Sequence, residues 1–78
     1  MPTILRVGPY RYFFYSADGM EPPHIHVERD DATAKFWLKP VRLTRSGGIN
    51  RAELIELERF VNDNAAQLLE AWDDFFST

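Results

Sequence analysis

The chain has 78 residues, of which 45% are hydrophobic and 14% aromatic, and its formal net charge at pH 7 is −3. A chain this short has no room for two hydrophobic cores, so residues 1–78 are expected to form a single domain. The absence of cysteine excludes thiolate catalysis, disulfides and cysteine-ligated zinc. No apolar run is long enough to predict a membrane span, and the first residues turn polar too soon for a signal peptide. We therefore expect a cytoplasmic protein without a membrane partner.

The two parts of the chain carry opposite charges. Residues 1–45 hold seven Lys or Arg against five Asp or Glu, a balance of +2. Residues 46–78 hold two basic residues against seven acidic ones, a balance of −5. The acidic part is expected either to solvate a helical surface or to meet a basic partner.

The first part of the chain favours strands. Ile4 to Val7 and Tyr10 to Ser16 are rich in β-branched and aromatic residues, and Gly8-Pro9 between them predicts a hairpin turn. Ser16 to Pro23 contains Asp-Gly and Pro-Pro, so a loop is expected there.

Two further strands are predicted from His24 to Arg29 and from Ala32 to Leu38, joined by a turn at Asp30-Asp31. A two-residue connection fixes the register and divides the side chains between two faces of the sheet. The apolar face pairs Ile25 with Phe36 and Val27 with Ala34. The other face pairs His24 with Trp37, His26 with Lys35 and Glu28 with Thr33. After Lys39-Pro40, a short fifth strand is expected from Val41 to Arg45.

The last part of the chain predicts helices. Asn50 followed by Glu53 resembles a capping box, and the residues after it contain neither Gly nor Pro. A single helix would be about twice as long as the strands it must cover. Asn62-Asp63-Asn64 is the weakest helical stretch, so helices are expected at 50–62 and 64–76, with a cap at Asn64 and Gln67 and one long helix as the alternative.

These elements define an α+β fold, in which an antiparallel sheet of four to five strands (about 3–45) is followed by a helical region (about 50–77). The core is expected to be built from the apolar residues of both patterns. The residues predicted to be buried are Ile25, Val27, Phe36, Leu54, Leu57, Val61, Leu68 and Trp72.

The stretch Pro22-Pro23-His24-Ile25-His26-Val27-Glu28 has the greatest chemical content in the chain. Alternate positions of a strand point to one face, so both imidazoles are expected outward, about 7 Å apart. They are candidates for acid–base catalysis on RNA, for metal binding, or for a solvated face without a site.

Further residues on this face are expected to bind rather than react. Cations would contact phosphate groups, and Trp37 would stack on unpaired bases. The candidate catalytic residues are His24 and His26, and the candidate binding residues are Lys35, Trp37, Arg42, Arg11 and Glu28. Glu28 or Glu21 could add an oxygen ligand, but there is no third histidine, so neither a metal nor a cofactor is predicted.

Several segments resemble the bacterial domain-of-unknown-function family 4160. They are Met1-Pro2-Thr3-Ile4, Phe14-Tyr15-Ser16, Glu21-Pro22-Pro23-His24-Ile25-His26-Val27, Ala34-Lys35-Phe36-Trp37-Leu38 and Leu68-Leu69-Glu70-Ala71-Trp72. The resemblance covers essentially the whole chain and implies a small component of a toxin–antitoxin-like gene pair. It brings no established activity and no catalytic residues.

Two functions are therefore expected as alternatives. In the first, the protein engages RNA or a small cognate partner protein through the face that carries His24 and His26. In the second, it is a non-catalytic interaction or dimerisation module that uses its acidic helices, with Phe75 and Phe76 exposed at their end.

Overall fold

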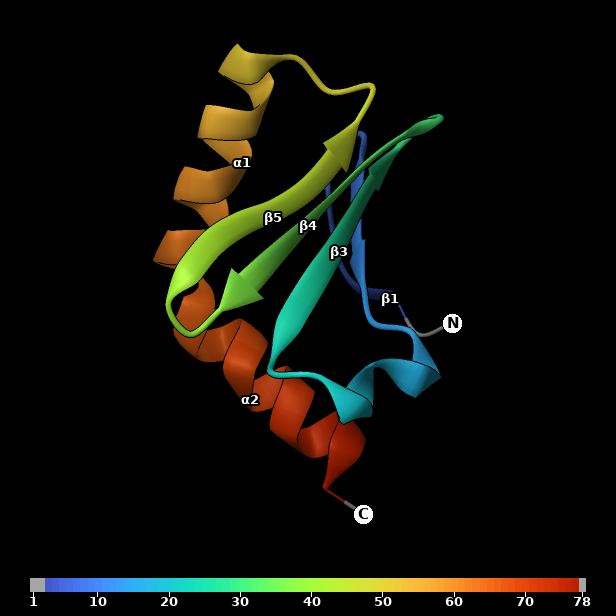
Figure 1. Ribbon diagram of the computed structural model, residues 1–78, viewed down its shortest axis with the longest axis vertical. Coiled ribbons are helices and arrows are strands. Elements are labelled where there is room, and N and C mark those ends of the chain that lie inside the picture. Colours follow the sequence, from blue (N-terminus) through green and yellow to red (C-terminus); the bar gives the residue numbers. More distant parts are fainter. Residues whose placement is uncertain (1–2, 78) are drawn as a thin grey trace.

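The structure is a computed structural model that describes residues 3–77, in which a five-stranded antiparallel sheet carries two helices on one face (Figure 1). The strands follow each other in space as they do in the chain, so every connection joins neighbours. They are β1 (Thr3–Val7), β2 (Tyr10–Phe13), β3 (His24–Arg29), β4 (Ala32–Leu38) and β5 (Val41–Gly47). The predicted α+β fold is confirmed.

The register between β3 and β4 is the one that the sequence predicts. Ile25 lies opposite Phe36, and His26 lies opposite Lys35. The turn between the two strands requires Asp30 in the left-handed region, with φ at 53°. Aspartate tolerates this conformation better than most residues, so the two-residue connection can close.

Two strand boundaries differ from the prediction. The second strand ends at Phe13, and a short 3-10 helix, η1 (Ser16–Met20), follows it. The chain leaves the sheet because Phe14 is completely buried and packs edge-on against Trp72, with 5.2 Å between the ring centroids. The fifth strand is longer than expected and continues to Gly47.

The core lies between the sheet and the two helices. Ile25, Val27 and Phe36 have no exposed surface, and each contributes about 1.5–3 kcal/mol by its removal from water. Of the residues predicted to be buried, only Leu54 differs, being half-buried.

The helices are α1 (Arg51–Asp63) and α2 (Ala65–Phe76), so the prediction of two helices is confirmed. Asn50 caps α1, because its side chain accepts a hydrogen bond of 2.8 Å from the Glu53 N–H. The predicted cap at Asn64 and Gln67 does not form. Instead the Asn64 amide donates to the Phe60 carbonyl, which ends α1.

A polar contact joins the sheet to α1. Glu53 accepts hydrogen bonds from the Tyr10 hydroxyl and from two nitrogens of the Arg29 guanidinium. The Tyr10 hydrogen bond, followed by the Arg29 contacts, holds the pKa of the Glu53 carboxyl below its ordinary value. The same hydrogen bond raises the pKa of Tyr10.

We predict that Glu53→Gln lowers the melting temperature near pH 7 and that this difference disappears in acid. A carboxyl whose pKa is lowered by folding stabilises the protein above its unfolded pKa of about 4.3, and the effect is lost as the pH falls through the folded value. Thermal melts between about pH 7 and pH 3 measure the difference. Glu58→Gln, on the exposed side of α1, is the control. A difference between wild type and Glu53→Gln that is constant over this range would contradict the prediction.

Candidate functional site

The face of the sheet that points away from the helices carries aromatic and basic side chains in rows across the strands. One row runs through directly paired residues of four strands, namely Phe13, His26, Lys35 and Arg45. A second row consists of His24, Trp37 and Arg42. The predicted site residues on β3, β4 and β5 therefore lie side by side, and we call this surface the outer face.

His24 differs from the expectation of an outward-facing imidazole. Its side chain has 0% exposure, because it lies at the beginning of β3 among the rings of Trp37 and Trp72, whose centroids are 5.6 and 5.1 Å away. Its Nδ1 lies 2.9 Å from the Pro22 carbonyl oxygen. The prediction that both imidazoles face solvent is thus wrong for His24.

His26 is nearer the surface, with 14% of its side chain exposed. Phe13 stacks on one side of the imidazole at 5.4 Å, and Tyr15 meets it edge-on at 4.7 Å. Burial lowers the pKa of His26 below its ordinary value, although the Asp18 carboxylate opposes this shift. The side chain is therefore favoured in its neutral form.

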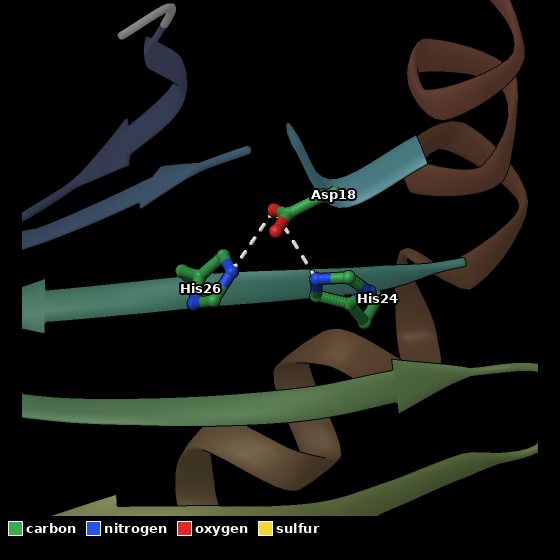
Figure 2. A group of neighbouring side chains, drawn as sticks. All are labelled: Asp18, His24 and His26. Carbon is green, nitrogen blue, oxygen red and sulfur yellow. Dashed lines mark hydrogen bonds and ion pairs between the residues drawn. The ribbon is translucent and has the colours of Figure 1, made fainter. Parts of the chain in front are cut away.

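Asp18, which the sequence analysis did not single out, meets both histidines (Figure 2). Its Oδ2 lies 3.1 Å from His24 Nε2 and 3.0 Å from His26 Nε2. The same oxygen accepts a hydrogen bond of 2.8 Å from the Tyr15 N–H. Burial opposes ionisation of Asp18, but the Tyr15 hydrogen bond and the two histidines outweigh it and hold the pKa of the carboxyl below its ordinary value.

The segment that carries Asp18 is positioned by α2. At Gly19 there is no side chain, and the Phe76 ring lies so close that an added Cβ would come within 2.9 Å of it. Phe76 also packs on Trp72, with 4.2 Å between the ring centroids. Phe75 and Phe76 are half-buried rather than exposed, so the expectation that they form an exposed apolar end is wrong.

Two of the predicted binding residues are held by carboxylates. Lys35 Nζ donates to Glu21 at 2.7 Å and lies 4.9 Å from the centre of the Trp37 ring. Arg11 donates to Glu28 at 3.1 Å. The hydrogen bond from Lys35 lowers the pKa of Glu21. Both acids that the sequence analysis considered as metal ligands are therefore engaged by cations.

Two hollows adjoin these residues. The larger, of about 450 Å³, is lined by Pro22, Pro23, Trp37, Lys39, Pro40 and Arg42. The smaller, of about 210 Å³, is lined by Phe13, Tyr15, His26, Val27, Thr33, Ala34, Lys35 and Arg45. The outer face thus offers concave surface beside aromatic rings and basic groups.

The sequence model of the family described as "Domain of unknown function (DUF4160)" matches residues 10–73. The chain therefore belongs to this family of uncharacterised proteins. No similar curated protein and no similar solved structure was found. Over residues 3–77, neither helix has both the length and the apolar character needed to cross a membrane.

We predict that the two histidines differ in their effect on stability. His24→Ala opens a cavity among buried rings and leaves the Pro22 carbonyl without its partner, so the free energy of unfolding should fall by about 2–4 kcal/mol. His26→Ala removes a partly exposed ring and should cost about 1 kcal/mol. Urea unfolding in EDTA measures both, and equal losses would contradict the burial of His24.

We also predict that two glycine substitutions have opposite effects. Gly19→Ala brings a methyl group against the Phe76 ring and should destabilise the protein by about 1 kcal/mol. Gly47→Ala is the matched control, because its Cβ would meet nothing within 4 Å and should stabilise by about 0.5 kcal/mol through the unfolded chain. Urea unfolding measures both changes. A Gly19→Ala protein as stable as wild type would show that η1 does not depend on this contact.

Proposed function

We propose that the outer face binds single-stranded RNA, with Trp37 as the stacking platform and Lys39 and Arg42 as the phosphate contacts. The observation that carries the proposal is the position of Trp37 directly opposite Arg42, at the side of the larger hollow. Single-stranded nucleic acids are bound by this combination of aromatic rings and a basic surface.

The basic side chains at this hollow are available to a ligand. Lys39 and Arg42 are exposed, and within residues 3–77 neither forms an ion pair. Trp37 is only half-buried, so part of its ring remains open to a base. The Lys35 ammonium group lies 4.9 Å from the centre of the Trp37 ring, a cation–π distance that helps to hold the ring in place.

The charge asymmetry of the chain supports binding at this face. The sheet comes from the basic part of the sequence, and the acidic helices lie on its other side (Figure 1). A polyanion would be attracted to the sheet and repelled by the helices. The charge distribution thus favours one orientation of an RNA strand.

The proposal assigns the histidines no catalytic step. His24 has no exposed surface, so a substrate cannot touch it in this conformation. His26 adjoins the smaller hollow and is available to contact an RNA base or phosphate at the end of the site.

The family resemblance adds a biological setting, which we propose as the action of a toxin–antitoxin-like pair in the bacterial cytoplasm. The support is only what the resemblance to this family, described in the sequence analysis, implies. Expression in a bacterial host with and without the neighbouring gene tests this setting. Growth that is the same in both cases would contradict it.

A second candidate is a non-catalytic module that binds a small cognate protein, or a second copy, through α1. Ile55 favours it, because 51% of this apolar side chain is exposed. Ile55→Lys should then abolish a dimer or a complex in sedimentation experiments without changing RNA binding. A protein that is monomeric and binds no product of the neighbouring gene would contradict this candidate.

We predict that Trp37→Ala weakens binding of a fluorescent oligouridine by about 5-fold or more, because stacking of one base contributes about 1–3 kcal/mol. Arg42→Gln should weaken binding and reduce the salt dependence by about one phosphate contact. Fluorescence anisotropy in EDTA at several salt concentrations measures both effects. Arg59→Gln on α1 is the control for loss of charge elsewhere. Equal affinities for wild type and Trp37→Ala would refute RNA binding at this face.

A further inference from the structure

We propose that Asp18, His24 and His26 bind one divalent transition-metal ion of the zinc class, which joins η1 to β3. The three ligand atoms come from two elements and lie within 4.8 Å of one another (Figure 2). This inference does not rest on RNA binding, because it concerns a largely buried cluster beside the proposed stacking surface.

The hydrogen bonding of His24 is the first argument. The Pro22 carbonyl can only accept, so the hydrogen of neutral His24 lies on Nδ1. Nε2 then carries a lone pair and faces another acceptor, the Asp18 Oδ2, at 3.1 Å. Despite this short distance the two atoms do not have hydrogen-bond geometry, and among the described residues the fully buried Nε2 has no hydrogen-bond partner. A cation bound by both atoms would give the Nε2 lone pair a partner, and it would take the place of the hydrogen bond between Asp18 Oδ2 and His26 Nε2.

The distances around Asp18 are the second argument. In a tetrahedral zinc site with bonds of about 2.0–2.2 Å, neighbouring ligand atoms are about 3.3–3.6 Å apart. The Asp18 oxygen lies 3.1 and 3.0 Å from the two histidine nitrogens, slightly closer than that spacing, so a small outward movement of the side chains would admit the ion. His26 Nε2 is hydrogen-bonded to Asp18 Oδ2 in the structure. Neutral His26 would present Nε2 to a metal after its hydrogen moved to Nδ1.

The atoms behind the ligands are already arranged as they are in metal sites. Metal-binding histidines usually donate their other nitrogen to a carbonyl or carboxylate, and His24 has this bond to Pro22. The Tyr15 N–H fixes the Asp18 carboxylate, and the exposed fractions of the Asp18 and His26 side chains are only 12% and 14%. These contacts reduce the conformational entropy that ligand ordering would cost.

The donor set determines the kind of ion. Two imidazoles and one carboxylate suit zinc, cobalt, nickel or iron(II), whereas calcium and magnesium prefer oxygen ligands alone. Three protein ligands leave a fourth position of a tetrahedral zinc ion for water or another small ligand. Glu21 and Glu28 contribute no ligand here, because they pair with Lys35 and Arg11.

The test is a titration of the EDTA-treated, dialysed protein with Co²⁺ and then Zn²⁺. We expect one Co²⁺ per chain with visible absorption bands of a low-coordinate site, and displacement of Co²⁺ by Zn²⁺. Zinc at 100 times its Kd should raise the melting temperature by about 10 °C or more in a domain of this size. No bands and no shift in the wild-type protein would overturn the proposal.

Variants distinguish this cluster from other sites of metal binding. Asp18→Asn and His26→Gln should weaken Zn²⁺ binding at least 10-fold and reduce the thermal shift accordingly, while Glu21→Gln and Glu28→Gln should behave as wild type. An unchanged shift in both Asp18→Asn and His26→Gln would place the ion elsewhere and refute the proposal.

A purely structural role for Asp18 has a different signature. If Asp18 only holds its neighbours in place by hydrogen bonds, Asp18→Asn lowers the melting temperature in EDTA and Zn²⁺ does not raise that of wild type, which would also refute metal binding. The oligouridine measurements are made in EDTA. Failure of either proposal therefore leaves the result for the other intact.

Discussion

The alternation along β3 is the constraint on which both the core and the candidate site depend. Ile25 and Val27 have no exposed surface and pack toward the helices, so His24 and His26 must lie on the opposite side of the strand. A slip of one residue would place the imidazoles in the core and the aliphatic side chains outside it. The tight turn at Asp30 fixes the register. Burial of Ile25 and Val27 makes this register energetically favourable.

Local sequence patterns were sufficient to predict most of the secondary structure. The strands, their pairing and the two helices follow from period-two alternation, short connections and the Asn50 cap. The position of Asp18 could not be predicted in this way. It lies in a 3-10 segment held by tertiary contacts of Phe14 and Phe76, and an Asp-Gly pair in a loop indicates only a turn.

The burial of His24 shows a second limit of sequence patterns. Alternation determines the side of the sheet to which a residue points, but not what else covers that side. At the beginning of β3, Trp72 of α2 and the η1 segment reach around the end of the sheet, and His24 is enclosed. His26, two residues further along the same face, retains some exposure. Phe76 of α2 is half-buried for a similar reason, because its ring packs against Gly19 of η1.

The proposed metal cluster and the proposed RNA surface both adjoin Pro22. Its carbonyl lies 2.9 Å from the His24 imidazole, and the same residue lines the hollow beside Trp37 and Arg42. Ordering of the segment between Asp18 and His24 therefore also orders one wall of that hollow. An ion at the cluster would act on RNA binding through this wall and through His26, which adjoins the smaller hollow. The two proposed sites thus differ in chemistry but share His26 and the short stretch of backbone at Pro22.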